Sequence, residues 1–203
     1  MTRGRRRANT APMKIALLAT ALACFSLAAC NPAPTADQLG QDDPNAAANA
    51  APRFYDAMSR TAESFTGGLE FHDEARAGPN AAPSMSVVAE MGHTWRITWI
   101  QDQAGADTVA GRPWVTLLPI AADASVNIYS VDNEVIKAGT PNGGLCAPAA
   151  TKFMVFSEGG NTRGERQLSI AAFSNEKWPP ENVTGLCGTF TYVLRQDSPP
   201  GAP

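Results

Sequence analysis

The chain has 203 residues, with 19 Asp and Glu against 16 Lys and Arg, and a formal net charge of −3. All of the acidic residues but only 11 of the basic ones follow residue 29, so residues 30–203 carry a net charge of −8. Nucleic acids and anionic lipid head groups require basic contacts. The acidic balance therefore argues against both as partners.

The first 29 residues have the pattern of a secretory signal peptide. Lys14 precedes an uncharged apolar run over residues 15–27, and such signals combine a basic start with roughly 7–15 apolar residues and a small-residue cleavage site. As a helix, this run would be about 20 Å long, whereas a hydrocarbon core is about 30 Å thick. The pattern favours a cleaved signal over a lasting membrane span, and it fits a start at either Met1 or Met13.

The apolar run ends in Leu27-Ala28-Ala29-Cys30. This ending resembles the lipobox of bacterial lipoproteins, whose cysteine becomes the lipid-modified first residue of the mature protein. The resemblance covers residues 13–30 and implies that the Cys30 thiol carries fatty (palmitate-type) chains, which tether the protein to the membrane of the cell envelope, facing the periplasm. Asn31, and not Asp, follows the cysteine, which by the family's sorting rule favours the outer membrane over the inner membrane.

The rest of the chain divides by composition. Residues 30–51 are polar and rich in Pro, Ala and Asn, a composition that cannot bury enough apolar surface to fold. We interpret them as the lipidated N-terminus and a flexible linker. Residues 52–196 have the usual size of one domain, predicted to be β-rich. Residues 197–203 include three prolines and one glycine and are expected to form a disordered tail.

Cys146 and Cys187 are the only cysteines beyond Cys30. In an oxidising compartment an isolated pair normally forms a disulfide, and closing a loop of about 42 residues would stabilise the fold by roughly 4 kcal/mol. Metal binding is disfavoured, because neither cysteine has a histidine nearby to complete a zinc site. We therefore predict a structural disulfide, no metal and no cofactor.

The predicted elements begin with a helix over residues 52–65. Phe54, Met58, Ala62 and Phe65 recur at helical spacing, and Gly67-Gly68 follows as a stop signal. Pro52 suits the first turn of a helix. We expect this stripe of apolar side chains to pack on the core.

Period-two alternation dominates after residue 67. The runs 84–90 and 95–99, separated by Gly92-His93, predict a β-hairpin. Further strands are predicted at 69–71, 113–120, 125–131, 152–157, 167–173 and 188–194. Turn signals such as Asp132-Asn133 separate them. The pattern indicates a mainly β fold, an antiparallel sandwich or small barrel with one short N-terminal helix.

Candidate catalytic residues are sparse, and none is assigned. His93 falls in the predicted hairpin turn and is expected to be solvated, whereas Trp95, Trp99 and Trp114 are expected to lie in the core. His72, at a strand end, and Trp178, in a Pro-rich loop, are the candidate ligand contacts.

These features favour a lipid-anchored, non-enzymatic binding or interaction module. Its expected partner is an envelope protein or a component of the cell wall. Three alternatives stay open. One is an envelope hydrolase, and another is an inhibitor similar to the lipoprotein lysozyme inhibitors, which are small disulfide-bonded barrels. The third is an assembly factor whose β-edge pairs with another chain.

Overall fold

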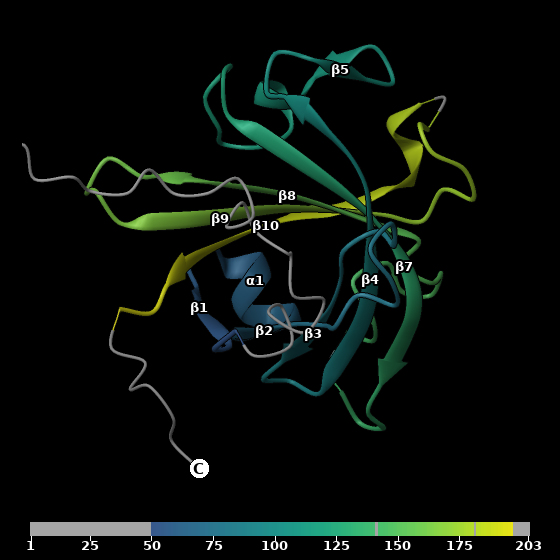
Figure 1. Cartoon of the computed structure of the whole chain (residues 1–203). Helices are drawn as coiled ribbons and strands as arrows, with labels where there is room; N and C mark the ends of the chain where they lie inside the picture. Colours follow the sequence, from purple (N-terminus) through teal and green to yellow (C-terminus); the bar gives the residue numbers. More distant parts are fainter. Residues whose placement is uncertain (1–49, 141, 181, 197–203) are drawn as a thin grey trace, which may run out of the picture. The chain divides into compact units, whose positions relative to one another are not determined.

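The computed structural model describes residues 50–140, 142–180 and 182–196, and these residues form one compact unit. Eight antiparallel strands close into a barrel in the order β1-β10-β9-β8-β7-β4-β3-β2 (Figure 1). The barrel strands are β1 (Arg53–Ala57), β2 (Leu69–Asp73), β3 (Ser84–Ala89), β4 (His93–Ala104), β7 (Ser125–Ile136), β8 (Phe153–Gly160), β9 (Arg166–Phe173) and β10 (Leu186–Leu194). The predicted mainly β, antiparallel architecture is confirmed as a barrel.

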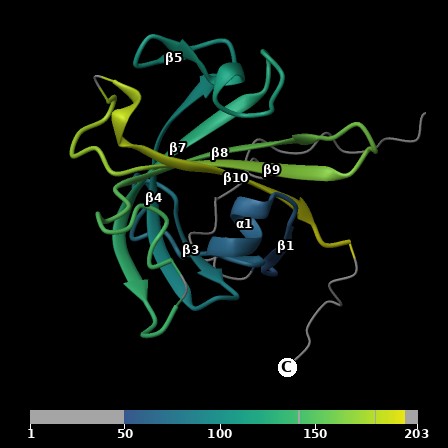
Figure 2. The same cartoon turned by 180° about the vertical axis from the view of Figure 1, so that it is seen from behind.

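Short elements complete the fold outside the strands of the barrel. They are the helix α1 (Arg60–Phe65), the ribbon of β5 (Thr108–Val109) and β6 (Arg112–Pro113), and the 3-10 turns η2 (Trp114–Thr116) and η3 (Val183–Gly185). The segment with β5 lies on one side of β8, β9 and β10, and α1 lies on the other side with β1 and β3 (Figure 2).

The predicted helix over residues 52–65 is wrong in its first half. Residues Arg53–Ala57 form β1, which pairs with β2 on one side and with β10 on the other and so closes the barrel. Hydrogen bonding along both edges of a strand outweighs a weak local periodicity. The helix begins only after Ser59, whose Oγ accepts a hydrogen bond from the Ala62 N–H at 3.2 Å.

Two further expectations are corrected. The predicted strand over residues 113–120 is a 3-10 turn after Pro113, and Trp114 at its start is fully buried. Asp132-Asn133 is not a turn but lies within β7, where Asn133 pairs with Arg96 and Val131 with Ile97. Asp132 is thus the extra residue of a β-bulge, a site where a strand bends without ending.

Side chains from all eight strands fill the barrel interior. Among them Trp95 and Ile97 have no exposed surface, and Phe71 meets the rings of Tyr55 and Phe156 edge to face at 5.3 and 5.6 Å. Small barrels are commonly filled in this way, so the interior is a packed core.

A second apolar cluster lies on the outer face of β7, β8 and β9. Trp114 packs there against Phe173, with ring centroids 6.3 Å apart. The predicted core position of the first three tryptophans is confirmed for Trp95 and Trp114, whereas Trp99 is half-buried. This cluster attaches the segment between β4 and β7 to the barrel.

Candidate site: a groove beside the open edge of strand β7

Strand β7 has one free edge over its second half. It pairs with β8 only from Asn127 to Ser130, whereas its pairing with β4 continues to Ile136. The Val131 N–H still donates to the Lys152 carbonyl at 2.8 Å, and beyond it the two chains separate. Among the described residues, no strand pairs with the edge of residues 132–136 that faces away from β4, and this half of β7 lies at the margin of the fold (Figure 1).

A groove of about 420 Å³ runs along this edge. The end of β7 forms one wall and the segment 148–152 forms the other. Its lining residues are Val131, Asp132, Asn133, Glu134, Ile136, Pro148, Ala149, Ala150, Thr151 and Lys152. The groove therefore opens where β7 and the chain leading into β8 diverge.

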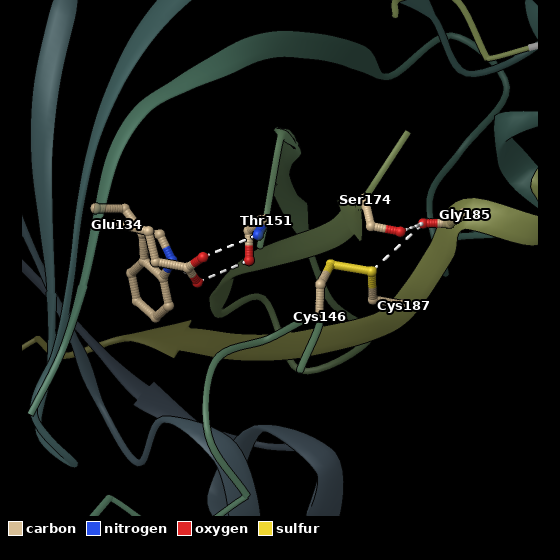
Figure 3. The surroundings of a disulfide bond; sticks show 7 residues. Glu134, Cys146, Thr151, Ser174, Gly185 and Cys187 are labelled. Atoms are coloured by element: carbon tan, nitrogen blue, oxygen red, sulfur yellow. Dashed lines mark hydrogen bonds between the residues drawn. A yellow bond between two sulfur atoms is a disulfide. The ribbon is translucent and has the colours of Figure 1, made fainter. Parts of the chain in front are cut away.

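Glu134 fastens the two walls to each other (Figure 3). One carboxylate oxygen accepts hydrogen bonds from Trp95 Nε1 at 2.9 Å and from Thr151 Oγ1 at 2.8 Å, and the other accepts from the Thr151 N–H at 2.8 Å. Hydrogen bonds to an ionised group are roughly twice as strong as neutral ones. Glu134 thus satisfies the indole N–H of a buried tryptophan and fixes the far wall of the groove.

The predicted disulfide between Cys146 and Cys187 is confirmed, and it holds the loop that leads into the far wall. Cys187 is the second residue of β10, so the disulfide joins the loop to one of the barrel strands. Gly144 packs in the same loop, where an added Cβ would stand 2.7 Å from Glu134 Oε1 and 3.0 Å from Ile136 Cδ1. A larger residue at position 144 would force the Glu134 or Ile136 side chain to shift.

The prediction that His93 is solvated is wrong, because its side chain has no exposed surface. It is the first residue of β4, and its ring stands edge to face with Trp95 at 5.3 Å. Neither ring nitrogen has a hydrogen-bond partner among the described residues, although the Gly143 main chain and the Glu134 carboxylate lie near. Burial lowers the pKa of His93, because the charged imidazolium loses its solvation.

The exposed side chains in the second half of β7 include two apolar residues and one carboxylate, and of the apolar pair Ile136 lines the groove whereas Val135 does not. Val135 and Ile136 are 52% and 45% exposed. Asp132 is exposed, and its carboxylate accepts hydrogen bonds from the hydroxyls of Thr98 at 2.6 Å and Ser130 at 3.4 Å. Main-chain groups, apolar side chains and a carboxylate are therefore available to a binding partner along this edge.

A second polar cluster lies at the other end of the barrel. The Tyr55 hydroxyl donates to Glu158 at 3.0 Å, and Arg53 bridges Glu158 and Asp73 at 3.1 and 3.3 Å. Burial, and then the nearby Glu158 carboxylate, raise the pKa of Tyr55 to about 12. These groups satisfy one another and join β1, β2 and β8, so we interpret the cluster as structural.

The structure does not bring the other predicted site residues to the groove. His72 is half exposed on β2, where its Nε2 lies 3.0 Å from Glu70 Oε1, and β3 and β4 separate it from β7. Trp178 is half-buried in the outer cluster and stacks on Trp114 with ring centroids 6.2 Å apart. Their roles as ligand contacts stay predictions. Cys30 lies outside the described residues.

The groove residues are not predicted from the sequence, because Asp132-Asn133 has the composition of a turn that ends the strand. The apolar pair Val135-Ile136, which follows after Glu134, is the signal in the sequence that the strand continues.

Within the described parts of the chain, no helix is long and apolar enough to span a membrane. Over the same residues, no three His, Cys, Asp or Glu side chains gather in a way that could hold a metal ion. Comparison with known proteins found no family model, no curated protein and no solved structure that matches this chain.

Proposed function

We propose that this protein is a lipid-anchored protein of the bacterial envelope that acts as a non-enzymatic interaction module, with the β7 groove as its contact site. The open edge of β7 carries the proposal, since it is exposed on a barrel whose interior is filled by its own side chains. A filled interior directs recognition to the outer surface. Unpaired strand edges are ready templates for a partner chain.

Two features support the anchored, extracytoplasmic part of the proposal. The Leu27-Ala28-Ala29-Cys30 ending resembles that of a lipoprotein signal, and disulfides persist mainly in oxidising compartments. Each buried methylene of an acyl chain contributes about 0.8 kcal/mol, so two or three chains on Cys30 would hold the protein firmly.

Site-specific photo-crosslinking in intact cells tests the proposal. A photoreactive amino acid replaces Ile136 in the groove, and a matched variant carries it at Val115, which is also exposed but lies in η2 outside the groove. We expect a defined protein or cell-wall adduct from position 136 and none from position 115. Identical adducts at both positions, or no adduct at 136, would contradict a contact site in the groove.

Inhibition of lysozyme is the second candidate function. The closed antiparallel barrel with one disulfide favours it, because the lipoprotein lysozyme inhibitors have a similar architecture. A fold alone does not fix an activity. The purified protein, added in excess to a lysozyme lysis assay, should slow lysis if this function is correct, and unchanged lysis would remove it.

A further inference from the structure

The structure points to one class of occupant for the groove: we propose an extended, cation-bearing peptide segment that adds to β7 as an antiparallel strand. This inference rests on the proposed function and specifies its mode of recognition. β8 already occupies the same edge of β7 as an antiparallel neighbour up to Ser130. A bound segment would continue the antiparallel pairing of this edge along residues 132–136.

The main chain provides the first part of the recognition. Five residues at about 3.3 Å each offer an edge roughly 16 Å long. In an antiparallel ladder, alternate residues direct their N–H and C=O groups toward one neighbour, so part of this edge points into the groove. Addition of a strand to such an edge is a common mode of peptide binding.

The side chains provide the second part. Asp132 has hydroxyl partners only, with no Lys or Arg within salt-bridge distance among the described residues. Lys152, on the far wall, has its charge compensated by Glu176 at 3.5 Å. A Lys or Arg of the bound segment would therefore complement Asp132, and an apolar neighbour would cover Val135.

The shape of the groove favours a single extended chain over the edge of a second barrel. The segment 148–152 stands opposite β7, and Thr151 is tied to Glu134 by two hydrogen bonds. The free edge of β7 thus faces the segment 148–152 across the groove. A single extended peptide needs only the space between these two walls, whereas a second folded copy would have to displace the segment 148–152.

Two synthetic peptides test this inference on the purified full-length lipoprotein in detergent. One has the sequence Thr-Lys-Val-Thr-Val-Lys-Thr, and the other carries Glu in place of both Lys. We expect the Lys peptide to bind at least tenfold more tightly than the Glu peptide, which corresponds to about 1.4 kcal/mol. It should also slow amide hydrogen exchange at residues 132–136.

Charge reversal supplies the matched control. Asp132→Lys should reverse the preference between the two peptides, and Asp123→Lys, at an exposed position outside the groove, should leave it unchanged. Thermal unfolding of both variants checks that they fold. If Asp132→Lys does not fold, Asp132→Asn replaces it and should abolish the preference.

The outcomes separate this inference from the proposed function. If neither peptide protects residues 132–136, or if Asp132→Lys leaves the preference unchanged, strand addition by a cationic segment is overturned. A partner crosslinked at position 136 would then still support the interaction module. A crosslink at position 136 to a second copy of this chain would overturn the peptide occupant and favour self-association.

Discussion

Glu134 is the residue on which the groove most directly depends, because three hydrogen bonds converge on its carboxylate. Glu134→Gln replaces one acceptor oxygen with an NH2 group that faces donors, and it leaves a buried polar group without a partner. Such a change costs about 1–3 kcal/mol. We expect this loss in the free energy of unfolding, measured by urea denaturation.

Glu176→Gln is the matched control for this prediction. The Glu176 side chain is 80% exposed and forms an ion pair with Lys152 at the surface. Exposed pairs typically contribute between 0 and about 1 kcal/mol. Equal losses in both variants would show that Glu134 has no special role in holding the far wall.

His93 makes the stability of the fold depend on pH. Burial lowers its pKa in the folded protein, whereas in the unfolded chain the ring takes up a proton near pH 6.5. As the pH falls through that value, the unfolded state gains a proton that the folded state does not. The contribution to stability is therefore complete above about pH 6.5 and is lost as the pH falls.

His93→Phe tests this prediction, because phenylalanine keeps an aromatic ring beside Trp95 and does not titrate. Urea unfolding at pH 7.5 and pH 5.5 gives the loss of stability for each protein. We expect a smaller loss in the variant than in the unmodified protein. An equal loss would mean that His93 is protonated in the folded state as readily as in the unfolded chain.

At the scale of elements, the loop between β7 and β8 is held to β10 by a covalent link. The residues that the Cys146–Cys187 bridge joins are 41 apart in sequence. Replacing both with serine should lower the free energy of unfolding by about 2–4 kcal/mol. Amide hydrogen exchange should accelerate first at residues 142–152, since the bridge is their nearest fixed point.

Exchange that accelerates uniformly over the whole barrel would contradict this local role. The variant Thr151→Val removes the hydroxyl contact to Glu134 but keeps the disulfide. It should loosen the far wall with a smaller effect on overall stability.

The sequence predicts the regular strands well, because their alternation directly reflects one buried and one exposed face. The β3 strand is an example, predicted over residues 84–90 and observed as Ser84–Ala89 with alternate residues buried. β1 could not be predicted in the same way. Its five residues become a strand only because β2 and β10 lie on either side of them, and such long-range pairing leaves no local pattern.

The groove shows the same limit at the level of a site. Its walls come from β7 and from a loop whose position depends on the disulfide and on Glu134. The cysteine pair could be predicted from compartment and count. The inward direction of the Glu134 side chain could not be predicted from the sequence, because the bulge at Asp132 shifts the alternation of β7 by one residue.

At the scale of the whole molecule, the proposed function depends on how the barrel is presented. The predicted linker over residues 30–51 lies, up to residue 49, outside the residues that the structure describes. The net charge of −8 on residues 30–203 would repel an anionic surface, so attachment would depend on the acyl chains.

Mass spectrometry of the intact protein, purified from the envelope of cells that produce it, tests the central claim most directly. The account predicts a chain that begins at Cys30, with the mass of a diacylglyceryl group on its sulfur. Cys30→Ser should abolish both the cleavage and the added mass. A chain that retains residues 1–29, or one with an unmodified thiol at Cys30, would contradict the lipid-anchored interaction module.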